Sequence, residues 1–164
     1  MAGDVTEAVT GPDDRLRALE QTVRRLTDLE EIRGLAAEYQ RLCDGGWDGP
    51  THADPDALTR LFTDDAEYAL PDLPVCHGSD EIRALFRRLQ DTIPWIVHYV
   101  ANPELEVTGD RAVGRIKGAA CFRRDGERHL TFGTYFGEFA RTGYGWRFAS
   151  WRFVRAQPPD RRPW

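Results

Sequence analysis

The sequence predicts an α+β domain in which helices come first and an antiparallel sheet follows. Before Pro94, apolar residues recur at three- and four-residue spacing, which is typical of amphipathic helices. After Pro94 the spacing changes to two, in segments rich in the β-branched and aromatic residues that favour strands. Helices followed by an antiparallel meander are typical of the α+β class. We expect the helices to close one face of a strongly bent sheet.

The composition narrows the range of partners. The chain has 164 residues, enough for one domain with a substantial core, and 41% of them are hydrophobic. Its net charge of -5 argues against nucleic acid or an anionic membrane as a partner, because no basic surplus is present. No apolar run is long enough to span a membrane, and the first residues lack the features of a signal peptide.

The cysteines point to a reducing compartment. Cys43, Cys76 and Cys121 are odd in number and widely spaced. We therefore expect reduced thiols in a cytoplasmic protein. No metal-ligand spacing joins these cysteines to the histidines, so no metal site is predicted.

The first helix is expected to begin at Asp13, after a flexible tail over residues 1–12. Its apolar residues alternate at three- and four-residue steps and form the narrow seam of a short coiled contact: Leu16, Leu19, Val23 and Leu26. This seam can pack on the body of the domain or on a second subunit, and we expect a homodimer or homotrimer. A single domain is predicted over 13–155, followed by a C-terminal tail over 156–164.

The apolar pattern continues from Ile32 to Asp44 as one stripe of an amphipathic helix. Gly45 and Gly46 are expected to end this helix, since glycine readily adopts the left-handed conformation. Asp44 is unusual, because a carboxylate in the last turn faces the negative end of the helix dipole. A residue that breaks a local rule is a candidate functional residue. A solvated aspartate is the alternative that this position alone leaves open.

Residues 45–55 are polar and predict a loop, with Trp47 as its one bulky apolar residue. His52, in the same loop, is expected to be solvated. The loop ends at Asp54 and Pro55, which are typical of an N-cap and the first position of a helix.

The remaining elements follow from caps, breakers and spacing. A short helix over 56–62 is followed by a strand over 66–70, and Ser79 is the expected cap of a helix that ends at Pro94. An Asp-Gly pair at 125–126 predicts a hairpin turn. The strands after Pro94 are expected over 95–100, 105–107, 112–122, 128–141 and 146–155.

His98 is the second candidate for chemistry. On a strand, His98, Val100 and Asn102 share one face, because side chains alternate. Buried polar groups need partners, and a carboxylate at Asp44 beside His98 would satisfy both side chains. It would also orient the imidazole as a general base. The alternative is a structural histidine bonded to a backbone carbonyl.

Several motifs in order resemble one family. These are Tyr-x4-Asp at 39–44, Leu-Phe-Thr-Asp-Asp-Ala at 61–66, Gly-x-x-x-Ile at 78–82, His-Tyr-x-x-Asn at 98–102, a Gly-Asp turn at 109–110, Gly-Thr-Tyr-x-x-x-Phe-x-Arg at 133–141 and a terminal Gly-Trp-Arg-Phe at 145–148. Together they resemble the SnoaL-like branch of the NTF2-like superfamily over roughly Leu26 to Arg155. The resemblance implies an NTF2-like cone: a curved antiparallel sheet closed by three N-terminal helices around a deep pocket, often dimeric through the sheet.

The resemblance also implies a chemistry. Members of this branch include scytalone dehydratase, bile-acid 7α-dehydratase, hexachlorocyclohexane dehydrochlorinase, ketosteroid isomerase and polyketide cyclases. In the dehydratases and the dehydrochlorinase, an Asp–His dyad removes a proton without any cofactor. Asp44 and His98 match this dyad, and Tyr39 matches a residue that assists the leaving group or carbonyl. In such enzymes the last strand often supplies an arginine to the site. Arg152, or its neighbour Trp151, is the candidate for the last-strand residue that faces the pocket.

We therefore predict a cofactor-independent dehydratase, cyclase or isomerase. Its expected substrate is an apolar cyclic small molecule of the polyketide, steroid-like or terpenoid type, from secondary-metabolite biosynthesis. For the aromatic candidates, ordinary core packing remains the alternative. The expected substrate-contacting residues are Trp47, Phe62, Tyr68, Trp95, Asn102, Phe132, Tyr135, Trp151 and Arg152.

A non-catalytic protein of the same fold is the competing hypothesis. It would bind a small molecule or serve as an oligomeric partner, as the β subunit of a ring-hydroxylating dioxygenase does. The fold alone does not distinguish the enzyme from the non-catalytic protein, because the same fold occurs in both. The joint presence of Tyr39, Asp44 and His98 favours catalysis.

Overall fold

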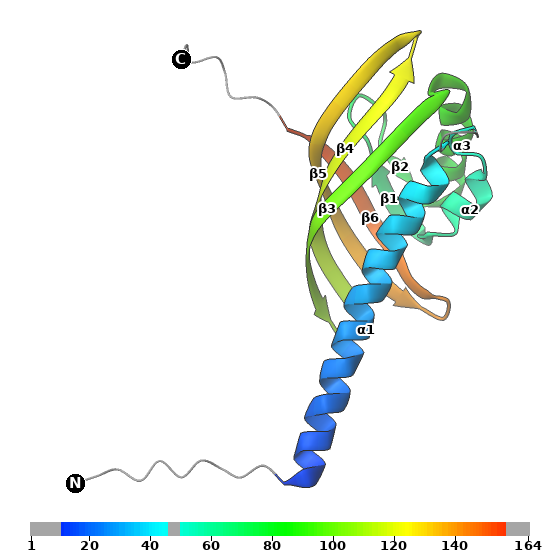
Figure 1. Ribbon diagram of the computed structural model, residues 1–164. Coiled ribbons are helices and arrows are strands. Elements are labelled where there is room, and N and C mark those ends of the chain that lie inside the picture. The colour runs from blue at the N-terminus through cyan, green and yellow to red at the C-terminus, as the bar shows by residue number, and fades with distance from the viewer. Residues whose placement is uncertain (1–10, 46–49, 157–164) are drawn as a thin grey trace, which may run out of the picture.

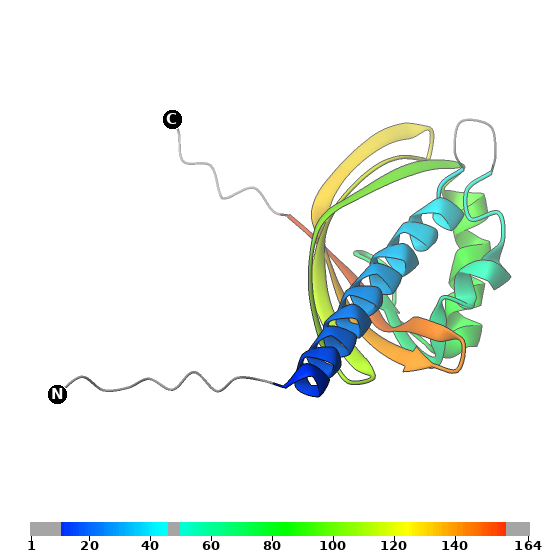
Figure 2. The same cartoon turned by 60° about the horizontal axis from the view of Figure 1, so that its bottom comes forward.

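The computed structural model describes residues 11–45 and 50–156, in which three helices lie on the concave side of one curved sheet (Figures 1 and 2). The helices are α1 (Pro12–Cys43), α2 (Pro55–Thr59) and α3 (Gly78–Thr92). The strands are β1 (Phe62–Ala69), β2 (Cys76–His77), β3 (Trp95–Thr108), β4 (Arg111–Arg124), β5 (Glu127–Thr142) and β6 (Gly145–Arg155). The predicted α+β class is confirmed.

The sheet is open, with strand order β2-β1-β6-β5-β4-β3. All neighbouring strands run antiparallel except β1 and β6, which are parallel. The β4–β5 hairpin turns at Asp125 and Gly126, whose φ angles of 52° and 81° are those of the type I′ turn that an Asp-Gly pair favours.

Helix α1 is continuous, so the seam and the central stripe belong to one element. Pro12 opens it, and Asp13 and Asp14 lie in its first turn, where a carboxylate complements the helix dipole. It ends at Asp44, which leaves the helix in an extended conformation with φ -77°. The chain therefore leaves the helix one residue before Gly45, and Gly46 lies outside the described residues.

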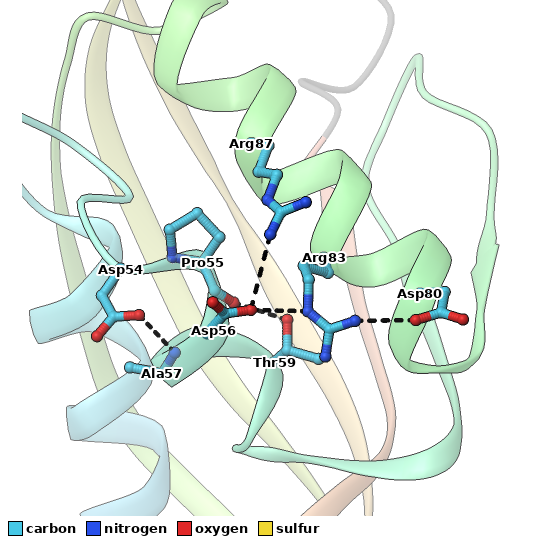
Figure 3. A network of polar contacts seen from close by, with 8 residues as sticks. All are labelled: Asp54, Pro55, Asp56, Ala57, Thr59, Asp80, Arg83 and Arg87. Atoms are coloured by element: carbon cyan, nitrogen blue, oxygen red, sulfur yellow. Dashed lines mark hydrogen bonds and ion pairs between the residues drawn. The ribbon is translucent and has the colours of Figure 1, made fainter.

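Surface carboxylates tie α2 to α3 (Figure 3). Asp54 caps α2, because its Oδ1 accepts the backbone N–H of Ala57 at 2.8 Å, as the sequence predicted. Asp56 then accepts a hydrogen bond from Arg83 Nε at 2.8 Å, and Arg83 also reaches Asp80 at 2.8 Å. Exposed pairs of this kind contribute about 0–1 kcal/mol each. These pairs link α2 to α3 and contribute little to the stability of the domain.

Two predicted boundaries near these helices were wrong. Phe62 is the first residue of β1 and does not belong to α2. Helix α3 begins at Gly78, so Ser79 lies inside it and caps nothing. The Glu81 carboxylate serves the start of this helix instead, because it accepts the backbone N–H of His77 at 2.8 Å.

Strand β3 is one long strand with a bulge, where two short strands had been predicted. The pairing with β4 shifts between Ala101 and Glu104, and Asn102 has a left-handed φ of 51°. A bulge interrupts the alternation of side chains. Asn102 is therefore exposed and does not share the inner face with His98.

Aromatic rings fill most of the space between the sheet and the helices. The rings of Tyr39, Phe148 and Trp151 lie 4.5–6.0 Å apart, and all three side chains are almost completely buried. Burial of this much apolar surface is the main source of stability in such a core.

A glycine on β4 makes room for this aromatic packing. A Cβ atom added to Gly118 would lie 2.6 Å from the ring of Tyr135, which is held from its other side by a stacked contact with Trp151 at 4.7 Å. Tyr135 therefore cannot move aside without disturbing the core. Gly34, in contrast, lies on the exposed side of α1 with no atom within 4 Å of such a Cβ.

We expect opposite effects from the same substitution at these two glycines. Gly118→Ala should lower the free energy of unfolding by about 1–3 kcal/mol, the usual cost of overpacking. Gly34→Ala should raise it by about 0.5–1 kcal/mol, because alanine favours the helix. Urea denaturation of both variants measures this. A neutral Gly118→Ala would show that the ring of Tyr135 is not confined as described.

Candidate active site

Asp44 and His98 meet between the end of α1 and the first half of β3. The Asp44 Oδ1 atom lies 2.6 Å from His98 Nδ1. Both carboxylate oxygens also accept the backbone N–H of His98 at 3.0 Å. The side chains are 19% and 8% exposed, so the pair is largely withdrawn from water. One carboxylate thus fixes both the main chain and the ring of His98.

This contact defines the tautomer of a neutral His98. A carboxylate accepts a hydrogen bond, so Nδ1 carries the proton and Nε2 carries the free lone pair. Nε2 makes no hydrogen bond to any residue within 11–45 or 50–156. The free nitrogen is therefore available to a bound molecule as a proton acceptor.

His98 lines a cavity of about 90 Å³ that lies between the C-terminal end of α3 and the inner face of the sheet. Its neighbours on β3 and β4, Ile96 and Ala120, share the inner face with His98 and line the cavity too. The wall is mainly apolar, with two guanidinium groups and one phenol. Its other residues are Leu70, Pro71, Leu73, Leu89, Ile93, Phe122, Arg124, Thr131, Tyr135, Phe153 and Arg155.

Three tyrosines lie close to the dyad, but only one lines the cavity. The Tyr39 ring centroid is 6.3 Å from that of His98, and the Tyr39 hydroxyl is hydrogen-bonded to the Tyr68 hydroxyl at 2.6 Å. Tyr135 packs against Tyr39, with centroids 6.2 Å apart, and belongs to the cavity wall. Burial raises the pKa of all three phenols, so each stays protonated and can donate a hydrogen bond.

The other predicted contact residues separate into three groups. Phe62, Tyr68 and Trp151 are buried core residues behind the cavity wall. Trp95, Phe132 and Arg152 are exposed on the outer face of the sheet, where Arg152 lies over the ring of Phe136 at 5.4 Å. Asn102 is exposed at the bulge, and Trp47 lies outside the described residues. Of the eight that lie within the described residues, Tyr135 alone lines the cavity.

His52 was predicted to be solvated and is in fact 3% exposed. Its backbone N–H donates to Cys43 O at 3.1 Å, and its carbonyl accepts from Gln90 Nε2 at 2.6 Å. Its ring stacks on Phe86, and Nδ1 has no partner among the described residues. Nothing in a polar loop signals such burial. His52 has a left-handed φ of 50°, and the two backbone hydrogen bonds hold it against the end of α1 and against α3.

Neither a group of metal ligands nor a membrane-spanning helix is found among the described residues. In the part of the chain that is described, no three or more His, Cys, Asp or Glu side chains group as metal ligands would. Likewise, no helix of the described ranges is long and apolar enough to cross a bilayer.

Known proteins share this fold. The family model of the SnoaL-like domain matches residues 24–152. An NTF2-like protein with a cystatin-like fold from Novosphingobium aromaticivorans is 29% identical, with 92% of this chain and 95% of that one covered and a TM-score of 0.72.

Two structures with lower identity show the fold alone. One from Novosphingobium aromaticivorans, provisionally assigned as a scytalone dehydratase, is 20% identical, with 87% of this chain and 93% of that one covered and a TM-score of 0.72. A type 2 hexachlorocyclohexane dehydrochlorinase is 18% identical, with 85% and 99% covered and a TM-score of 0.72. A comparison with curated proteins finds no match.

The buried His52 should make the stability of the protein depend on pH. Burial, together with the nearby His98, lowers the pKa of His52 to about 3, while the unfolded chain titrates near its ordinary value of about 6.5. Below that value the unfolded state binds more protons, so stability falls as the pH falls, by up to about 1.4 kcal/mol per pH unit. Denaturant melts of His52→Gln between pH 7 and 5 should show a shallower loss than the wild type.

The exposed His77 provides the control for this experiment. His77→Gln should keep the pH dependence of the wild type. If His52→Gln kept it too, His52 would not be the buried neutral imidazole described above.

Proposed function

The chain belongs to the SnoaL-like domain family, and we propose that it is a cofactor-independent enzyme in which His98 removes a proton from a carbon next to a carbonyl group. The contact of 2.6 Å between Asp44 and His98 Nδ1, at the wall of an apolar cavity, is the observation that carries this proposal. A binding module of the same fold has no evident need for an oriented imidazole whose second nitrogen is free.

The proposed reaction class is elimination of water from a β-hydroxy carbonyl compound. Nε2 of His98 takes the α-proton, and the electron pair of the C–H bond moves into an enolate. The enolate then expels the hydroxyl group, which receives the proton back from Nε2 and leaves as water. His98 returns to its neutral form, and the carbon skeleton gains one double bond. Asp44 stabilises the imidazolium that exists between the two proton transfers.

Tyr135 is the proposed donor to the enolate oxygen. It is the phenol in the cavity wall, and its raised pKa keeps the proton on the oxygen, so that it can stabilise developing negative charge. Tyr39, proposed from the sequence for this contact, lies one layer deeper with its hydroxyl on Tyr68. We propose that Tyr39 and Tyr68 position Tyr135 and His98 from behind.

The volume and the wall of the cavity limit the size and the polarity of the proposed substrate. Its volume of about 90 Å³ is smaller than a cavity of about 150 Å³ that holds benzene. A six-membered ring therefore enters this cavity only when side chains of the wall move apart. Leucine, isoleucine and phenylalanine side chains dominate the wall, which favours an apolar ring. Cyclisation and double-bond isomerisation pass through the same enolate and would use the same residues.

We expect the protein to catalyse two linked events on 3-hydroxycyclohexanone in deuterated buffer. These are exchange of the protons beside the carbonyl and release of cyclohexenone, both followed by proton NMR. Asp44→Asn and His98→Gln should each slow exchange by about 10²–10⁴-fold, the usual contribution of a general base. Tyr135→Phe should slow it by a smaller factor.

Two exposed residues provide matched controls, because Asp65→Asn and His77→Gln make the same chemical changes away from the cavity. Both should exchange at the wild-type rate. Denaturant melts of all variants confirm that each is folded. Binding of the ketone with an exchange rate equal in the wild type and His98→Gln would support the non-catalytic binding module instead.

A further inference from the structure

The first half of α1 is a projecting helix with an unpartnered apolar seam. Every residue from 12 to 27 is exposed, and this part of the helix extends beyond the sheet (Figure 1). The seam residues are themselves 56–62% exposed: Leu16, Leu19, Val23 and Leu26. The sequence left open whether this seam packs on the body of the domain, and the structure shows that it does not.

The seam points away from the body of the domain. Burial on α1 begins at Asp28 and follows a stripe through Ile32, Leu35 and Tyr39. At about 100° per residue, the centre of the seam lies about 170° around the helix from the centre of this stripe. When the seams of two copies pack together, each domain therefore lies on the side of its own helix that faces away from the other copy. The two domains do not obstruct each other.

The spacing and the residue types match a two-stranded coiled coil. Leu16 and Val23 occupy a positions, and Leu19 and Leu26 occupy d positions, of two consecutive heptads. Val23 at a with leucine at d is the combination that favours two strands in a parallel coiled coil. The next a and d positions are Glu30 and Arg33, which form a surface ion pair at 3.4 Å. The seam therefore stops where the helix joins the domain.

Charges beside the seam favour the parallel arrangement of two identical chains. Arg15 is at a g position and Glu20 at the following e position. In a parallel pair, g of one helix faces the following e of the other, so Arg15 meets Glu20 twice. An antiparallel pair faces g with g and e with e, and loses both contacts. Neither side chain forms an ion pair with any residue of the described ranges.

We propose that residues 12–27 pair in parallel with the same segment of a second copy of this chain. The resulting coiled coil connects the two domains through their projecting N-terminal helices. Both cavities and the outer faces of both sheets stay free. The inference does not depend on the proposed function. Two heptads give a short coiled coil, so the association is expected to depend on protein concentration.

Cysteine cross-linking tests the arrangement. In a parallel pair Leu19 lies beside its own copy, whereas Gln21, at an f position, points away from the partner. In a Cys121→Ser background, Leu19→Cys should form a disulfide-linked dimer under mild oxidation, and Gln21→Cys should remain monomeric on a non-reducing gel. Cys43 and Cys76 are buried and stay in both variants. Equal cross-linking of the two variants, or none in either, would overturn the proposal.

Sedimentation equilibrium tests the charge pairing. Arg15→Glu should raise the dissociation constant several-fold, because Glu would face Glu, and the double variant with Glu20→Arg should restore it. Leu19→Asp with Val23→Asp should abolish this association. All these residues are exposed in the domain, so the variants keep the fold. Dissociation constants that none of these substitutions changes would overturn the coiled coil.

Discussion

The Asp44 carboxylate is the interaction on which the site depends. It accepts the backbone N–H and faces the ring Nδ1 of His98, and so it joins the end of α1 to the first half of β3. A buried carboxylate is costly unless it is paired and hydrogen-bonded, and here one residue supplies both partners. The same position explains why an aspartate ends a long helix: Asp44 leaves α1 in an extended conformation, and its side chain serves the neighbouring strand instead of the helix.

The aromatic core behind the dyad gives this contact its rigidity. Tyr39 packs against His98 and against the rings of Tyr135 and Trp151, and its hydroxyl is held by Tyr68. Gly118 leaves room for the ring of Tyr135 to pack closely against β4, and the stacked ring of Trp151 confines it as well. Packing of this kind would hold the groups of the proposed reaction in place before a substrate binds, and such preorganisation is the main source of electrostatic stabilisation in enzymes. It also leaves little empty space, which is why the cavity is narrow.

Local sequence rules predicted the fold class and the hairpin at Asp125, because both depend on neighbouring residues. The pairing of Asp44 with His98 followed from the family resemblance, since the two residues lie far apart in the sequence and local patterns left a solvated aspartate and a structural histidine open. Asn102 was misplaced because a bulge, which periodicity does not reveal, turns it outward. The predicted contact residues were mostly core or outer-face side chains, since alternation alone does not say which face is inside. His52 was missed because its burial depends on the fold of a polar loop. The seam was recognised, but only the structure shows that it faces away from the domain.

The central claim is that Asp44 holds His98 in one tautomer with Nε2 free. Nitrogen-15 NMR of the imidazole measures this directly at a pH where His98 is neutral, because protonated and unprotonated ring nitrogens have well-separated chemical shifts. We predict a protonated Nδ1 and an unprotonated Nε2 in the wild type, and a mixture of tautomers in Asp44→Asn. A His98 protonated at Nε2 in the wild type would contradict this claim, because Nε2 could then not accept a proton.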